Sequence, residues 1–251
     1  MSLENVAVVL SRPKLSENIG TAARAAANMG LGRLIVVQPF RLEEEIMMAA
    51  ATRAGQELIR TLTVFDDFDQ ALAGFHFVVG TTARRGSKRG PFHTPRQAAP
   101  GLIQAARENR VALVFGAERS GLTTDELRRC QTVVCIPTAS ASTSSLNLAQ
   151  AVLVLGYELL LARNQAPPER LEYKPAPVSE LQDMYDHFQR TMVRIGFLPE
   201  DNTEHWLMSF KRLFNRTGLT HGDCNLVRGM CRQIDWAVDH GRPTHSNEDE
   251  P

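Results

Sequence analysis

The sequence predicts an α/β fold, a mostly parallel sheet covered by helices on both faces, followed by a small helical domain. Short runs rich in valine and isoleucine, each of strand length, recur through the first two thirds of the 251-residue chain. Helical patterns separate these runs, and this order is typical of parallel sheets that are buried on both faces. After Arg163 prolines gather among charged residues, and only helical patterns follow. Because proline ends helices and stiffens linkers, we expect a domain boundary there.

The elements of the first domain, residues 1–163, follow from these patterns in order. Six apolar runs bounded by turn residues are expected to be strands: residues 6–10, 34–37, 62–65, 77–80, 112–115 and 133–136. Helices are expected at about residues 17–29, 43–50, 68–73, 95–107 and 124–129. A long apolar helix, residues 146–163, then closes the domain.

A linker with four prolines, residues 164–178, leads to the second domain, residues 179–240. Three helices are expected in it, at about residues 179–195, 203–215 and 224–240. In the first of them, apolar side chains recur at helical spacing from Leu181 to Ile195, which predicts one buried face. The end of the chain, residues 241–251, is acidic, and we expect it to be disordered.

The composition limits the classes of protein that the chain can belong to. Hydrophobic residues make up 43%, enough for a large core, while Lys+Arg and Asp+Glu both count 28, so overall charge does not indicate a nucleic-acid partner. No signal-peptide pattern opens the chain, and the most apolar stretch, residues 146–162, contains Asn147, Gln150 and Glu158. We therefore expect a cytoplasmic protein without a membrane span. The four cysteines lack Cys-x-x-Cys spacing, so we expect reduced thiols and no metal site.

The first candidate site segment is Asn18-Ile-Gly-Thr-Ala-Ala-Arg24, which follows the first expected strand. On a helix, Gly20 and Arg24 share a face. We expect Gly20 to leave room for a bulky ligand and Arg24 to project a positive charge over that space. The alternative is an ordinary surface arginine on an alanine-rich helix.

The second segment is Phe115-Gly-Ala-Glu-Arg-Ser-Gly-Leu122, which follows another expected strand. Its glycines have nearly the spacing of a phosphate-binding P-loop. Leu122, however, stands where that loop requires lysine, so we do not expect a site for a nucleoside triphosphate. A third strand ends in a similar run of small residues, Gly80-Thr81-Thr82-Ala83, and each glycine alone could be a turn residue.

The third segment runs from Ile136-Pro137 to Ser144-Ser-Leu-Asn-Leu-Ala-Gln-Ala151. Ser144 or Ser145 could simply be the N-cap of the long apolar helix. Asn147 near the helix start favours a binding role for this segment, because asparagine is a poor helix former. A helix N-terminus with free N–H groups can hold the polar edge of a ligand.

Local charge points to RNA where the overall charge does not. Residues 70–107 contain no carboxylate but include a strongly basic segment, with Arg84, Arg85, Lys88 and Arg89. A second basic group, including Lys211 and Arg212, lies in the helical domain. Two such patches suit a folded RNA that is bound through its phosphates, although each could be solvated surface charge.

Together the three segments resemble the motifs of the SPOUT-type RNA ribose 2′-O-methyltransferases in residues, order and spacing. The linker and tail, with Lys211-Arg-Leu-Phe214 and Asn225-Leu-Val-Arg-Gly229, resemble the bacterial tRNA (cytidine/uridine-2′-O-)methyltransferase J family. This resemblance implies methyl transfer from S-adenosylmethionine to the ribose 2′-OH of nucleotide 32 in the tRNA anticodon loop. It also implies a C-terminal trefoil knot in the α/β domain, an exception to the rule against knots, and a homodimer.

The resemblance also implies roles for individual residues. The cofactor-binding positions fall on Thr81, Thr82, Ala83, Gly116, Ile136, Ser144, Ser145 and Leu146. The catalytic and RNA-contacting positions fall on Asn18, Arg24, Glu118, Ser145 and Asn147.

The chemistry of these residue types agrees with methyl transfer to an alcohol. No histidine or cysteine lies in the motifs, and a guanidinium stays protonated near neutral pH. We therefore expect Arg24 to stabilise the developing alkoxide and to grip the adjacent phosphate. Glu118 could orient Arg24 or offset the positive charge of the cofactor. Two other functions stay open, methylation of ribosomal RNA and RNA binding without catalysis.

Overall fold

The computed structural model describes residues 3–83, 92–139, 145–164, 174–199, 201, 203–215 and 218–241. It divides the chain into two compact units, Met1–Val178 and Ser179–Pro251. The segment 84–91, which contains the predicted RNA-binding residues Arg84, Arg85, Lys88 and Arg89, lies outside the described residues, and so does Ser144.

The first unit contains a seven-stranded sheet in the order β3-β2-β1-β6-β4-β7-β5. Its strands are β1 (Leu3–Ser11), β2 (Leu31–Val37), β3 (Thr63–Phe65), β4 (Phe77–Thr81), β5 (Phe92–His93), β6 (Val111–Phe115) and β7 (Thr132–Val134). Every pair of neighbouring strands is parallel. The predicted α/β class with a mostly parallel sheet is thereby confirmed.

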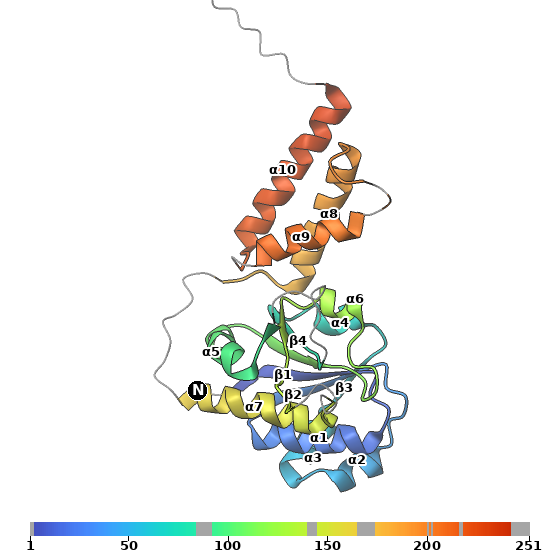
Figure 1. Cartoon of the computed structure of the whole chain (residues 1–251), viewed down its shortest axis with the longest axis vertical. Coiled ribbons are helices and arrows are strands. Elements are labelled where there is room, and N and C mark those ends of the chain that lie inside the picture. Colours follow the sequence, from blue (N-terminus) through green and yellow to red (C-terminus); the bar gives the residue numbers. More distant parts are fainter. Residues whose placement is uncertain are drawn as a thin grey trace, which may run out of the picture. The chain divides into compact units, whose positions relative to one another are not determined.

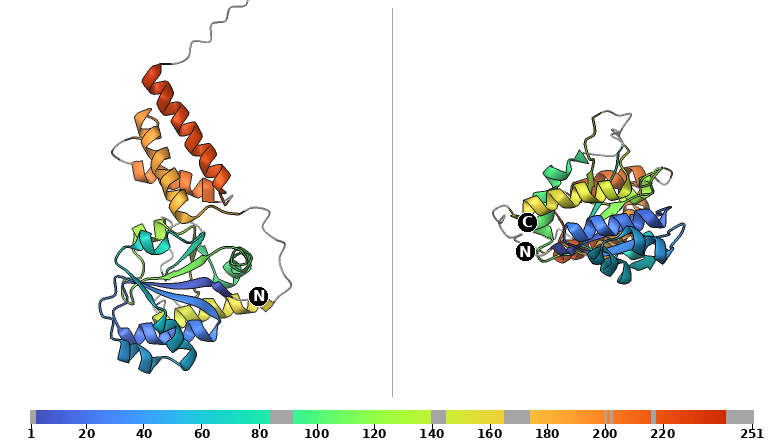
Figure 2. Two further views of the ribbon diagram at one scale, coloured as in Figure 1. Left: turned by 180° about the vertical axis from the view of Figure 1, so that it is seen from behind. Right: turned by 90° about the horizontal axis from the view of Figure 1, so that it is seen from below.

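Helices cover both faces of this sheet (Figures 1 and 2). They are α1 (Ser16–Asn28), α2 (Glu44–Ala50), α3 (Arg53–Arg60), α4 (Phe68–Leu72), α5 (Pro95–Ala105), α6 (Thr124–Arg128) and α7 (Leu148–Asn164). Along β1, Val8 and Leu10 belong to one apolar cluster, which includes buried residues of α1, α5 and α7. Ala7 and Val9 belong to a second cluster, with residues of α4 and α6. Because successive side chains of a strand point to opposite faces, a strand buried on both sides has to be apolar throughout.

Two elements of the first unit are absent from the sequence-based prediction. Helix α3 begins after Thr52, whose side chain accepts a hydrogen bond from the Gly55 amide. This cap is a local signal that could have revealed the helix. Strand β5 has only two residues and pairs with β7, so it is too short to show a period of its own.

The second unit consists of α8 (Val178–Arg194), α9 (Thr203–Asn215) and α10 (His221–His240) in its described residues. The three predicted helices are present, and α10 begins earlier than expected because Thr220 and Asp223 form a capping box there. Aromatic rings of α8 and α9 pack together, with 5.0 Å between the ring centroids of Phe188 and Phe210. Met184 and Cys224 are fully buried in the same unit.

Three further properties of the described residues bear on function. Among them, no helix combines the length and apolarity that crossing a membrane would require. No three histidine, cysteine or acidic side chains in this part of the chain gather as metal ligands would. The four cysteines are buried free thiols.

Candidate active site

A pocket lies at the carboxyl ends of β6, β4 and β7, which are neighbours in the sheet. It is lined by residues 81–83, 115–122, 134, 136, 145–146, 148 and 151. Ligands of open α/β sheets bind outside the carboxyl ends of the strands. The second and third segments singled out in the sequence, together with residues 81–83, thus meet at the edge of the sheet where a ligand is expected.

The predicted cofactor-binding residues gather in this pocket. Those that line it are Thr81, Thr82, Ala83, Gly116, Ile136, Ser145 and Leu146. Strand β7 ends at Val134, two residues before the predicted end, and this leaves Ile136 in the connecting segment that lines the pocket. Further lining residues, such as Ala117, Ser120 and Ala151, belong to the same motif segments but received no role from the sequence.

One wall of the pocket is the loop of residues 115–122, and its shape depends on Gly116. A Cβ atom on Gly116 would lie 2.1 Å from the Gly121 carbonyl carbon and from the Leu122 amide nitrogen. Gly121 has a positive φ of 67°, and its amide donates to the Ala117 carbonyl at 2.7 Å. Gly116 is therefore required by the folding of the loop on itself, before any ligand is considered.

A chain of hydrogen bonds joins three of the predicted catalytic residues. The Asn147 side-chain amide donates to Asn18 Oδ1 at 3.2 Å, and the Asn18 amide donates to Glu118 Oε1 at 2.8 Å. Glu118 lines the pocket, Asn18 lies on α1, and Asn147 directly precedes α7. Residues from all three motif segments are thus connected.

The Glu118 carboxylate also accepts hydrogen bonds from the backbone amides of Lys14, at 3.1 Å, and Leu15, at 3.4 Å. Burial by itself raises the pKa of Glu118, but the bonds from Asn18 and from backbone amides outweigh it, so the net pKa lies below the ordinary value. Glu118 is therefore ionised at neutral pH. Its partners are Asn18 and the turn before α1, and no bond to Arg24, which Glu118 was alternatively expected to orient, is among them in the described residues.

Asn147 acts as the N-cap of α7, which begins at Leu148 and not at the predicted residue 146. Its Oδ1 accepts from the Ala149 amide at 2.9 Å, and the Gln150 side chain accepts from the Asn147 amide at 3.1 Å. This reciprocal arrangement satisfies amide groups that the first turn of a helix leaves free. It also places the Asn147 amide group outside the helix, where it reaches Asn18.

Gly20 does not leave room for a ligand, so that expectation is wrong. A Cβ atom on Gly20 would lie 2.3 Å from the Met47 carbonyl oxygen, because α2 packs against α1 at this point. Arg24, one turn further along α1, is exposed and has no partner among the described residues. Arg24 does not line the pocket either, so its predicted catalytic role stays a prediction.

The predicted RNA-binding residues of the second unit lie on α9. The Lys211 ammonium is 5.1 Å from the centroid of the Tyr185 ring, a cation–π contact within the unit. Arg212 is exposed. Only Arg212 is thus clearly directed to solvent.

Family comparisons show which proteins this chain is similar to. Residues 5–157 match the SpoU rRNA Methylase family, and residues 179–246 match the C-terminal domain of the tRNA methyltransferase TrmJ. A protein of Pectobacterium atrosepticum named tRNA (cytidine/uridine-2′-O-)-methyltransferase TrmJ is 37% identical over 236 residues, which cover 92% of this chain and 97% of that protein. The chain belongs to the TrmJ family. It is therefore a methyltransferase of the SpoU type.

Solved structures agree with the TrmJ assignment. The crystal structure of TrmJ from Z. mobilis ZM4 is similar with a TM-score of 0.77 and 31% identity, covering 91% of this chain and 98% of that one. The SpoU methyltransferase AviRb from Streptomyces viridochromogenes, solved with the cofactor AdoMet, has a TM-score of 0.51 at 23% identity. It covers 64% of this chain and 61% of that one, and at this identity it supports the fold alone.

Proposed function

We propose that this TrmJ-family protein transfers a methyl group from S-adenosylmethionine to the ribose 2′-OH of cytidine or uridine 32 in the tRNA anticodon loop, in the cytoplasm. One observation carries the proposal: the pocket at the ends of β6, β4 and β7 is lined by two motif segments and bonded to the third through Asn18. The TrmJ relatives are named for methylation of the 2′-oxygen of cytidine and uridine, and the proposal takes the methylated atom and the two nucleotides from those names.

The pocket residues fit S-adenosylmethionine, which supplies a methyl group on a positively charged sulfur. Ile136 and Leu146 offer apolar contacts, and the loop of residues 116–122 offers backbone groups. Glu118, ionised at neutral pH, lines the same pocket and favours a cationic ligand. These residues would hold the cofactor and exclude water from it.

The remaining polar residues act on the RNA side. Methyl transfer is an in-line displacement, so the 2′-oxygen has to be held in place and its developing charge stabilised. Arg24 carries a permanent charge, and no other described side chain neutralises it, so it can serve an oxyanion and a neighbouring phosphate. Asn18, in the first turn of α1, is fixed between Glu118 and Asn147 and offers a positioned side-chain amide.

We further propose that two copies of the chain form a homodimer through α7. Leu153, Tyr157 and Leu161 follow one another at four-residue spacing on this helix, Val154 lies beside Leu153, and all four are 36–50% exposed. Such a continuous apolar stripe is unusual on a surface that faces only water. A second copy of the chain, placed against the stripe, would bury it. The trefoil knot implied by the resemblance also stays a prediction.

The second unit is proposed to bind tRNA. The match to the TrmJ C-terminal domain supports this role, as do the exposed Arg212 and Arg232. Trp206 and Trp236 are 50% and 45% exposed, and aromatic rings of this kind can stack on unpaired bases. The basic segment 84–89 would add phosphate contacts from the first unit.

The deciding experiment offers methyl-labelled S-adenosylmethionine and either unmodified tRNA transcripts or unmodified ribosomal RNA to the purified full-length protein, and maps the methylated nucleotide. The matched control is the same transcript with a 2′-deoxy residue at position 32, which lacks only the accepting hydroxyl. We expect label at nucleotide 32 and none in the deoxy transcript. Label in ribosomal RNA but not in tRNA would favour that alternative substrate. Binding of tRNA without transfer to any RNA would make the protein a non-catalytic binder.

A further inference from the structure

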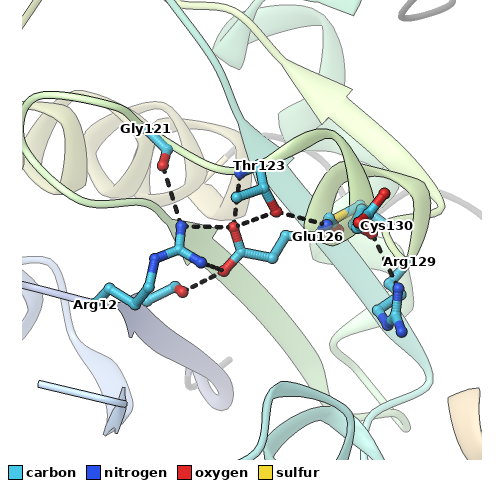
Figure 3. A network of polar contacts seen from close by, with 8 residues as sticks. Arg12, Gly121, Thr123, Glu126, Arg129 and Cys130 are labelled. Atoms are coloured by element: carbon cyan, nitrogen blue, oxygen red, sulfur yellow. Dashed lines mark hydrogen bonds and ion pairs between the residues drawn. The ribbon is translucent and has the colours of Figure 1, made fainter.

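A buried carboxylate, that of Glu126, lies behind the pocket wall formed by residues 115–122 (Figure 3). Glu126 is 6% exposed and belongs to the capping box that begins α6. Its side chain accepts from the Thr123 amide at 2.6 Å and from the Thr123 hydroxyl at 2.9 Å. Because Thr123 directly follows residues 115–122, these bonds fix the C-terminal end of the pocket wall to Glu126.

Glu126 also accepts hydrogen bonds that are not part of the helix cap. Their donors, Ser11 and Arg12, lie at the end of β1. Arg12 Nη1 donates to Glu126 Oε1 at 2.9 Å and Nη2 donates to Oε2 at 2.8 Å, a bidentate ion pair. The Ser11 hydroxyl donates to the same carboxylate. Arg12 Nη2 also lies 3.5 Å from the Gly121 carbonyl oxygen, within the wall itself. Bidentate pairs of this type combine strength with a defined geometry.

The backbone of Arg12 is unusual as well. Its φ is +51°, a left-handed conformation that residues with a Cβ atom rarely adopt. Its amide is fixed by a 2.8 Å bond to the Val37 carbonyl of the neighbouring strand. Strained residues of this kind persist only where the surroundings hold them, and they gather at functional sites.

The charge state of the pair is clear. Burial acts to raise the pKa of Glu126, but hydrogen bonds from Ser11, Thr123 and Arg12 outweigh it, so the net pKa lies below the ordinary value. Glu126 is thus an ionised carboxylate at neutral pH, and Arg12 is its counter-ion. Removing the cation would leave a buried charge unpaired, which is strongly unfavourable.

We propose that Arg12 is a positioning residue, which fixes the pocket wall of residues 115–122 against the end of β1 through Glu126 and the Gly121 carbonyl. The same connecting segment holds the other part of the wall, because the Lys14 and Leu15 amides donate to Glu118. The wall is therefore anchored on both sides to the chain that enters α1. This keeps the cofactor pocket in register with the helix that bears the predicted catalytic residues. The inference rests on the proposed function, in that the occupant of the pocket is S-adenosylmethionine.

Two full-length variants test the proposal: Arg12→Met and Arg12→Lys. The matched control is Arg60→Met, which removes an exposed ion pair with Glu57 on α3, away from the pocket. Titration calorimetry measures the affinity for S-adenosylmethionine, and hydrogen exchange of the ligand-free proteins measures the protection of amides 117–123. The exchange measurement needs no cofactor, so it judges the anchoring of the wall independently of the proposed function.

We expect Arg12→Met to weaken S-adenosylmethionine binding at least tenfold and to speed exchange of the wall amides by a similar factor. Arg12→Lys keeps the charge but loses the bidentate geometry, so it should fall between Arg12→Met and the unchanged protein. The control should match the unchanged protein. A lower melting temperature with unchanged affinity and exchange would reduce Arg12 to a stabilising role and overturn the proposal. If the protein with the natural sequence binds no S-adenosylmethionine, the proposed function fails. The positioning role is judged separately, because it is overturned if the wall amides of the Arg12 variants exchange at the same rate as those of the natural sequence.

Discussion

Replacing Arg24 by alanine is expected to remove methyl transfer while the fold and the cofactor pocket stay intact. The Arg24 side chain is exposed, has no partner among the described residues and does not line the pocket. Alanine and arginine are both good helix formers, so the free energy of unfolding should change by no more than about 0.5 kcal/mol.

The expected loss of activity follows from the charge that Arg24 supplies. Removing one group that faces a developing oxyanion costs roughly 3 kcal/mol of transition-state stabilisation. Since each 1.36 kcal/mol corresponds to a factor of ten, the rate should fall by about a hundredfold or more. Arg24→Lys should recover part of the rate, because lysine keeps the charge but cannot grip an oxyanion and a phosphate in the same fixed geometry.

The assay is single-turnover methyl transfer at saturating tRNA and S-adenosylmethionine, with calorimetry to confirm unchanged cofactor affinity. Arg60→Ala serves as the matched control, since it removes an exposed arginine from the neighbouring helix α3. Near-normal turnover of Arg24→Ala would refute the catalytic role. Loss of cofactor affinity with a folded protein would instead mean that Arg24 belongs to the pocket.

Three further variants test other parts of the molecule. Asn147→Ala should lower the free energy of unfolding by about 1 kcal/mol through loss of the α7 cap. Asn147→Ser should restore the cap but not the bond to Asn18, so both variants should slow methyl transfer. Methyl transfer gives the activity of each variant, and thermal melting followed by circular dichroism gives its stability. Full activity of the serine variant would show that the bond to Asn18 is dispensable. Tyr157→Glu places a charge in the apolar stripe of α7 and should convert a dimer to monomers in sedimentation velocity. If the protein with the natural sequence itself sediments as a monomer, the proposed dimer is contradicted. A chain that ends at Val178, the last residue of the first compact unit, should bind S-adenosylmethionine normally. It should bind tRNA more weakly and with a smaller salt dependence, because phosphate contacts release counterions. Equal affinities and equal salt slopes of the truncated and full-length proteins would show that the second unit does not contact RNA.

The sequence by itself determined the fold class, the main elements and the place of the pocket. Apolar runs such as Val6 to Leu10 are buried on both faces, and this requirement is visible in any strand that a parallel sheet encloses. The motif segments follow strands, and the carboxyl ends of parallel strands meet at one edge. The resemblance to the methyltransferase family assigned Thr82, Gly116 and Ile136 to a cofactor site, and all three line one pocket.

Only the tertiary structure decided what the individual side chains in and around the site contact. Gly20 faces the Met47 carbonyl rather than a ligand, because α2 happens to cross α1 there. Asn147 both caps α7 and bonds to Asn18, which lies 129 positions earlier in the chain. Arg12 and Glu126 form their ion pair across 114 positions. Local periodicity reflects the conformation of neighbouring residues, whereas such contacts depend on how distant elements pack, and no local pattern of residues records that packing.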